Sequence, residues 1–370
     1  TALWREAGFP ERFALAAVGG YGRGELYPYS DVDILVLLPE SYPAALNDCV
    51  ERFIGALWDC GLEVGHSVRT ISQCLDAAAS DLTVETTLSE ARLITGNRAL
   101  FERLMRQFGE QRDPVAFLHA KIEERRRRHE KFPDRPSNLE PNLKESPGGL
   151  RDLHTVLWIA RAAGLGASWR DLAREHLIAP LEASAIEWRE HVLQNLRIRL
   201  HYRASRREDR LLFDYQTALA KERAISAKGN RLPSEVLMAG YYRAARTICQ
   251  LTTLLLQNLA GRIDPAPESD AVVLNDDFRI RAGRIEALDD KLFYRRPSAI
   301  FEMFLLLQQN ADRAQDIAAP TLRALWRAKI KVDANFRKNP VNQALFLEIL
   351  RQPRRVVTVL RRMNEYGVLG

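Results

Sequence analysis

Apolar residues near the start of the chain are grouped in short runs that predict buried strands. Residues 13–18 and 34–38 are almost continuously apolar, which is typical of strands covered on both faces of a sheet. Residues 62–68 alternate instead, so Glu63 and Gly65 share one face of a third strand. The pattern predicts a small sheet in the first part of the chain.

Further along, apolar residues recur at helical spacing. Asp81 precedes such a segment at 82–94, and its carboxylate suits the N-terminal cap of a helix. We expect further helices over 98–108, 114–131 and 233–259, and a helix followed by a polar corner over 183–216. A break at 261–270, a hairpin that bends at Gly283, and helices from 298 to the end complete the pattern. Strands followed by helices predict an α+β fold, and 370 residues with 46% apolar side chains allow two or three domains.

Four glycines lie within six residues between the first two strands: Gly19, Gly20, Gly22 and Gly24. Glycine has no Cβ, so such a turn can take positive φ values and let backbone N–H groups approach an anion. We expect a helix to begin over Arg23 to Tyr27, which adds its free N–H groups, and Ser30 to cap the turn into the second strand. The segment predicts a phosphate-binding loop.

Two aspartates open the second strand. Alternation places Asp31 and Asp33 on one face, where their carboxylates repel each other unless a cation lies between them. Mg²⁺ held by two carboxylates and by substrate phosphates fits this arrangement. Two such ions would activate an attacking oxygen and neutralise a departing pyrophosphate. The alternative is a surface turn with acidic residues at the mouth of an ordinary strand.

A second informative segment covers residues 140–159. Its prolines and glycines form a loop that enters a helix, and Lys144 and Arg151 flank the loop where they would reach triphosphate oxygens. Asp152 either serves the helix dipole or orients Arg151. The alternative is a tight turn between domains with ordinary surface charges. The basic run at 123–131 pairs glutamates with arginines at i,i+4, which predicts a solvated helix face more than a nucleic-acid patch.

Charge and cysteine content narrow the setting. A net charge of +6 and a pI near 9.2 suit an anionic partner such as a nucleotide or an acidic protein. The four cysteines form no CxxC pair, which argues against zinc and disulfides and favours a reducing cytoplasm. No secretory signal begins the chain, and no apolar run approaches the roughly 18 to 20 residues of a membrane helix. Because Thr1 opens the sequence, we expect it to be a piece of a longer protein.

The paired glycines at 19–20 followed by SDVD at 30–33 resemble the signature of polymerase-β-type nucleotidyltransferases. The longer string GGYGRGELYPYSDVD, together with PNLKESPGGLRDL at 141–153, resembles more narrowly the bacterial bifunctional uridylyltransferase/uridylyl-removing enzymes, which modify the PII nitrogen-signalling protein. The likeness covers nearly the whole chain. A dinucleotide-binding fingerprint that starts at Gly20 fails at Glu25, and no Walker A lysine follows.

The resemblance implies a mixed-sheet nucleotidyltransferase domain over 1–140, a mainly helical domain over 141–262, and a hairpin with further helices over 263–370. It also implies Mg²⁺-dependent transfer of UMP from UTP to a tyrosine hydroxyl of PII. Asp31 and Asp33 would hold two metal ions, and Glu63 would be a third carboxylate, although Glu63 equally fits a solvated strand residue. The nucleotide-binding residues would be Gly19, Gly20, Arg23, Ser30, Lys144 and Arg151.

Other functions remain open at this point. They are adenylylation of a protein such as glutamine synthetase by a related enzyme, an RNA-binding or RNA-tailing activity, and a catalytically silent docking module. No residue pattern identifies the base that is read. None of the seven histidines is followed by aspartate, so we expect the HD domain of the family, the ACT domains beyond it and uridylyl removal to be missing from this chain.

Overall fold

The structure, a computed structural model, describes residues 1–41, 47–131, 139–265 and 271–369. It divides into two compact units, Thr1–Ala245 and Arg246–Gly370. The division falls within the long helix α12 (Pro233–Ile263). Each unit contains a four-stranded sheet and several helices, so the chain has the mixed α+β fold expected from the sequence.

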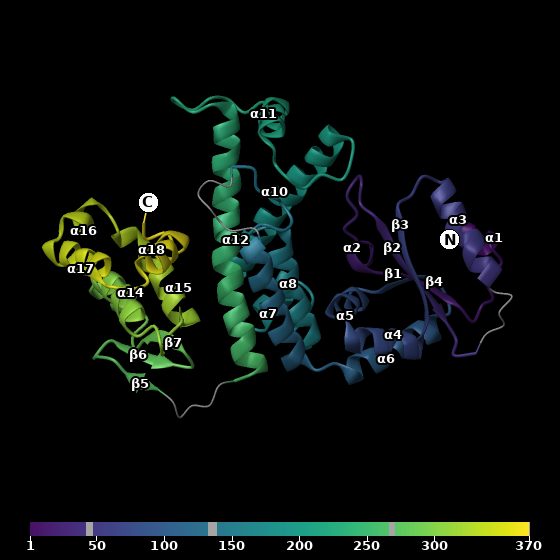
Figure 1. The fold of residues 1–370 in the computed structure, drawn as a ribbon, viewed down its shortest axis with the longest axis horizontal. Coiled ribbons are helices and arrows are strands. Elements are labelled where there is room, and N and C mark those ends of the chain that lie inside the picture. Colours follow the sequence, from purple (N-terminus) through teal and green to yellow (C-terminus); the bar gives the residue numbers. More distant parts are fainter. Residues whose placement is uncertain (42–46, 132–138, 266–270, 370) are drawn as a thin grey trace. The chain divides into compact units, whose positions relative to one another are not determined.

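The sheet of the first unit has the order β3-β2-β1-β4 (Figure 1). Its strands are β1 (Ala14–Ala17), β2 (Val32–Leu38), β3 (Val64–Thr70) and β4 (Arg92–Gly96). β1 pairs antiparallel with β2 and with β4, whereas β2 and β3 run parallel. The sheet is therefore mixed, and its central strands are the two apolar runs that the sequence pattern identified.

Helices cover both faces of this sheet. One core joins Ala14, Ala16, Leu35 and Leu37 to α4 (Ile71–Ser80) and α6 (Arg98–Gln111). A second core joins the alternate residues, including Phe13, Leu15, Ile34 and Val36, to α1 (Ala2–Glu6) and α3 (Asn47–Asp59). Burial on both faces explains why β1, and β2 from Ile34 onward, are continuously apolar.

Three local predictions were wrong in their boundaries. The helix expected at 82–94 is α5 (Leu82–Ser89); Asp81 caps it as predicted, but the chain then turns into the unpredicted strand β4. The helix expected to begin at Arg23 is the single turn α2 (Gly19–Arg23), formed by the glycines themselves. The third strand begins at Val64, two residues later than expected, because its residues pair with β2 from Val32 onward.

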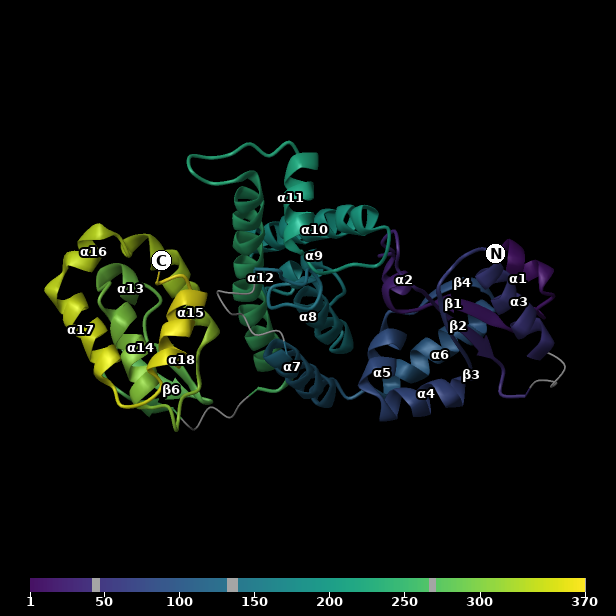
Figure 2. The same cartoon turned by 45° about the horizontal axis from the view of Figure 1, so that its top comes forward.

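The rest of the first unit is helical (Figure 2). Its helices are α7 (Pro114–Lys131), α8 (Leu150–Ala162), α9 (Trp169–Arg174), α10 (Pro180–Ala204) and α11 (Phe213–Glu222), followed by the start of α12. In α8, Leu153, Val156 and Ile159 are fully buried. A buried α8 fixes the position of the loop that precedes it.

The second unit begins within α12 and contains the predicted hairpin. Strands β6 (Phe278–Arg281) and β7 (Arg284–Ala287) are joined by Ala282 and Gly283, whose φ values of 49° and 69° are those of a tight hairpin turn. Strands β5 (Val272–Val273) and β8 (Asp316–Ile317) flank them. The following helices are α13 (Leu292–Arg295), α14 (Ala299–Gln309), α15 (Ala319–Ala328), the 3₁₀ turn η3 (Lys329–Lys331), α16 (Ala334–Lys338), α17 (Pro340–Arg351) and α18 (Val356–Glu365). No helix among the described residues has the length and apolar character required to cross a membrane.

Candidate active site

The glycine-rich segment leaves β1 and packs closely on its surroundings. Gly19 has a φ of +55°, and a Cβ built there would lie 3.1 Å from Asp33 Oδ2. A Cβ on Gly22 would collide with the backbone oxygen of Glu90. These positions require glycine, because they bring the backbone beside a carboxylate and against the end of α5. Ser30 closes the segment by accepting a hydrogen bond from the Tyr27 N–H at 3.2 Å.

Asp33 lies on β2, and Asp31 immediately precedes this strand. The pKa of Asp33 is raised, first because its half-buried carboxylate is desolvated and second because Asp31 is close by. Asp31 is exposed, and its Oδ2 lies 3.0 Å from the guanidinium of Arg207. The two carboxylates repel each other, and the guanidinium of Arg207 already contacts one of them. Their oxygen atoms are hard donors of the kind that Mg²⁺ prefers.

Glu63 lies outside this group. It is exposed and precedes β3, and it does not line the cavity described below. Its backbone oxygen accepts a 2.8 Å hydrogen bond from the Val32 N–H, so its backbone is next to the Asp31–Asp33 segment. The structure thus places Glu63 beside the two aspartates in the sheet, with its side chain away from the cavity wall.

The loop before α8 presents Lys144 and Arg151. Asn142 holds the loop, because its Oδ1 accepts hydrogen bonds from the N–H groups of Lys144 and Glu145 at 2.9 and 2.7 Å. Arg151 donates to Glu145 at 3.2 Å. Burial and the neighbouring Arg151 lower the pKa of Lys144. A cation whose charge is destabilised in this way gains from binding an anion.

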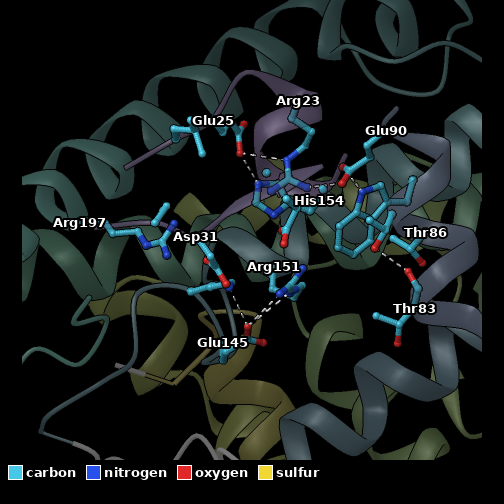
Figure 3. A pocket seen from close by; sticks show the side chains of 18 of the residues that line it. Arg23, Glu25, Asp31, Thr83, Thr86, Glu90, Glu145, Arg151, His154 and Arg197 are labelled. Atoms are coloured by element: carbon cyan, nitrogen blue, oxygen red, sulfur yellow. Dashed lines mark hydrogen bonds and ion pairs between the residues drawn. The ribbon is translucent and has the colours of Figure 1, made fainter. Parts of the chain in front are cut away.

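Both segments face one cavity of about 330 Å³ (Figure 3). The predicted residues that line it are Gly19, Gly20, Arg23, Ser30, Asp31, Asp33, Lys144 and Arg151. Side chains that the sequence reasoning did not select also line it: Glu25, Leu26, Thr83, Thr86, Thr87, Glu90, Lys121, Glu124, Glu145, His154, Trp158, Arg197 and Arg207. The structure therefore brings together residues from α2, β2, α5, α7, α8 and α10, but not Glu63.

A buried polar network joins the two segments. Arg23 contacts Glu25 at 3.1 Å and Glu90 at 2.5 Å, and Trp158 donates its indole N–H to Glu90. His154 Nε2 lies 3.1 Å from Glu25 Oε2. Burial, reinforced by Arg23, lowers the pKa of His154 to about 4. Burial alone would raise the pKa of Glu25, but contacts with His154 and Arg23 lower it to about 2.

This network connects the glycine-rich segment to α8, the helix that follows the second loop. Arg23 lies between Gly22 and Gly24, Glu25 follows Gly24, and His154 follows Arg151 by three residues on α8. The sequence signal for the pair was present, since both residues lie inside the two segments singled out. Their contact could not be inferred because 129 positions separate Glu25 from His154.

Asp152 does not orient Arg151. It is fully buried and holds Arg128 at 2.5 Å, His129 at 2.9 Å and Arg125 at 3.3 Å, all from α7. It also accepts a hydrogen bond from the Gly148 N–H at 2.8 Å. The basic run of α7 is thus not wholly a solvated face, because part of it anchors the loop that carries Lys144.

A second cationic edge comes from α10 and the loop after it. Arg197 lies 4.0 Å from the ring centre of Tyr27, and Asp209 accepts its Nε–H at 2.5 Å. Lys144, Arg151 and Arg207 line the same cavity as this arginine, and Arg207 contacts Asp31 directly. Cations beside two carboxylates suit a metal-bound polyphosphate, in which the phosphates contact both the metal and the arginines.

Three family models match successive parts of the chain. A family model described as a nucleotidyltransferase domain matches residues 4–94. The model of the GlnD PII-uridylyltransferase matches residues 116–256, and that of the uridylyltransferase GlnD third domain matches residues 278–370. The three matches follow one another along the chain.

Similarity over the whole of this chain is found to curated proteins named bifunctional uridylyltransferase/uridylyl-removing enzyme. The chain is 49% identical to those of Nitrosospira multiformis and Burkholderia orbicola and 48% identical to that of Chromobacterium violaceum. Each alignment covers 100% of this chain but only 42% to 43% of the relative. The chain therefore spans less than half the length of these relatives.

Proposed function

This chain belongs to the family of bifunctional uridylyltransferase/uridylyl-removing enzymes, and on that premise we propose that it transfers UMP from UTP to a tyrosine hydroxyl of the PII signal protein. Pyrophosphate would leave. The nucleotidyltransferase domain supports the reaction class. The donor UTP, the acceptor tyrosine and the partner PII are proposed from membership of the family. We place the reaction in the cytoplasm, as the cysteine content predicts.

One observation supports the proposal most strongly. Asp31 and Asp33 share a cavity with Lys144 and Arg151, although more than a hundred residues separate the two groups in the sequence. Nucleotidyl transfer requires carboxylates for a metal ion and cations for the leaving pyrophosphate within one site. Charge neutralisation and positioning supply most of the rate in such in-line displacements.

The proposed roles follow the chemistry of each group. Asp31 and Asp33 would hold Mg²⁺, with two ions expected, and the bound metal would supply neutralisation of phosphate charge. Gly19, Gly20 and Ser30 would support the phosphates from the sheet side. Lys144 and Arg151 would hold them from the helical side.

Two predicted nucleotide-binding or catalytic residues need separate treatment. Arg23 is already engaged by Glu25 and Glu90, so we propose that it positions the glycine-rich segment and does not clamp phosphate directly. Glu63 remains our candidate for a third carboxylate, supported by its backbone contact with Val32 next to Asp31. Glu63→Gln with near-normal turnover would remove it from the site.

The test is incubation of the chain with labelled UTP, Mg²⁺ and PII, next to Asp33→Asn. We expect labelled PII from the wild type and at least a roughly hundredfold slower reaction from the variant. Asp48→Asn, on the exposed side of α3, is the matched control and should label PII normally. Equal labelling by wild type and Asp33→Asn would refute the metal site.

Labelled ATP offered in parallel separates the proposal from protein adenylylation. We expect PII to be labelled from UTP and not from ATP. Labelling from ATP, or labelling of glutamine synthetase in place of PII, would refute the proposed donor and acceptor while keeping the nucleotidyltransferase chemistry.

A further inference from the structure

A buried lysine in the cavity wall has no role in the proposed transfer. Lys121, on α7, is 2% exposed, and its ammonium contacts Glu124 Oε2 at 2.6 Å. It also lies 4.5 Å from the ring centre of Trp158. Both Lys121 and Glu124 line the cavity. Burial lowers the pKa of this lysine, although the contact with Glu124 acts in the opposite direction.

The pair lies next to cations that suit phosphate. Arg151 and Arg23 lie over the same Trp158 ring as Lys121, 5.3 and 5.9 Å from its centre. In Figure 3, Asp31 and Arg197 lie on one side of the cavity and Thr83 and Thr86 on the other, with Arg151 between them. With the triphosphate held at the aspartates and Arg151, the nucleoside would extend toward α5 and α7.

The groups at that end have defined hydrogen-bonding characters. Thr86 and Thr87 donate their hydroxyl protons to the backbone oxygens of Leu82 and Thr83 at 2.6 and 2.7 Å, so toward the cavity their oxygens act as acceptors. Lys121 is a donor only, and ionised Glu124 is an acceptor only. A ligand edge with a carbonyl beside an N–H complements the Lys121–Glu124 pair.

We propose that the Lys121–Glu124 pair selects the uracil base of the donor nucleotide, with Glu124 accepting the N3–H and Lys121 donating to the O4 carbonyl oxygen. The inference rests on the proposed function, which it deepens by assigning base choice to two residues. With Lys121 at O4, cytosine would bring its N4 amino group against Lys121 and its N3 lone pair against the Glu124 carboxylate. Selection comes from the loss of both hydrogen bonds.

The test is binding of UTP, CTP and dUTP to the full chain, measured by calorimetry with Mg²⁺ and without PII. We expect the wild type to bind UTP at least tenfold more tightly than CTP. Glu124→Gln presents either a donor or an acceptor, so its preference should fall to about threefold or less while UTP binding persists. Lys121→Met keeps the buried stem and should weaken UTP binding about tenfold.

The matched controls are two other charged residues of the same helix. Glu123 pairs with Arg126 and Arg127, and Lys131 is exposed at the helix end, so Glu123→Gln and Lys131→Met should leave all three affinities unchanged. A wild-type preference for UTP that Glu124→Gln fully retains would overturn the inference and leave the proposed function standing. The same holds if the variants change only the UTP to dUTP ratio, since the pair would then bind ribose. A wild type with no preference for UTP would instead refute the proposed donor.

Discussion

Gly65 on β3 lies directly beside Asp33 on β2. The two residues are register partners in the parallel pair, and a Cβ built on Gly65 would overlap the Asp33 Oδ1 atom. The nearest atoms around that position all belong to Asp33, with its Cγ at 3.5 Å and its Cα at 4.0 Å. Gly65 therefore leaves the space in which the Asp33 carboxylate takes its present orientation.

Gly65→Ala should damage the site much more than the fold. The Asp33 carboxylate can rotate away from the added methyl group, which spares the sheet but moves a proposed metal ligand. We expect uridylyl transfer to PII to fall by roughly a hundredfold, with a loss in unfolding free energy of about 1–3 kcal/mol. Initial rates and urea denaturation of the same preparation measure both effects.

Gly55→Ala is the matched control for that prediction. Gly55 lies in α3, and a Cβ there meets no atom within 4 Å. Alanine favours a helix over glycine by about 1 kcal/mol, so this variant should be slightly more stable and fully active. Normal activity in Gly65→Ala would show that the orientation of Asp33 is not required.

The glycine-rich segment and the two aspartates could be predicted from sequence because their chemistry is local. Spacing alone placed Asp31 and Asp33 at one end of β2, facing the same cavity as Gly19. The position of α2 could not be predicted, since glycine is a poor helix former and tertiary contacts, such as that of Gly22 with Glu90, override its propensity.

Long-range pairings account for the rest of what sequence reasoning missed. β4 is five residues long, and only its antiparallel pairing with β1 distinguishes it from an extension of α5. The run at 123–131 contains Arg126 and Arg127, which pair with Glu123 as expected for a solvated face. Arg125 and Arg128 in the same run instead turn toward Asp152, a distinction that i,i+4 spacing cannot reveal.

Asp152→Asn should destabilise the first unit. Contacts with Arg125, His129 and Arg128 outweigh burial and hold the pKa of Asp152 well below its usual range, so it is ionised at neutral pH. Asparagine keeps the shape but leaves buried cations without a countercharge, which costs about 3–5 kcal/mol. Urea denaturation followed by circular dichroism should show an earlier transition. Glu123→Gln, which removes surface pairs with Arg126 and Arg127, should leave the urea midpoint close to that of the wild type. Equal midpoints for wild type and Asp152→Asn would contradict this anchoring role.

Glu190 on α10 should make stability depend on pH near neutrality. A carboxylate oxygen of Glu190 lies within 4.8 Å of a carboxylate oxygen of Glu25 and of a ring nitrogen of His154. Burial raises the pKa of Glu190 to about 7, although Trp169 donates a 2.8 Å hydrogen bond to its carboxylate. The folded state thus holds this proton more tightly than the unfolded chain does. The resulting stability is complete below the unfolded pKa of about 4.5 and is lost as the pH rises through 7.

Glu190→Gln tests this dependence because glutamine stays neutral at every pH. Wild type and variant should have similar unfolding free energies at pH 5, and at pH 8 the variant should be more stable by on the order of 3 kcal/mol. The lowered pKa of His154 acts in the opposite window, since its contribution is lost as the pH falls from 6.5 toward 4, and it affects both proteins alike. Glu222→Gln, at an exposed position of α11, should follow the wild-type curve. Parallel curves for wild type and Glu190→Gln from pH 5 to 8 would show that Glu190 is ionised throughout that range in the folded protein.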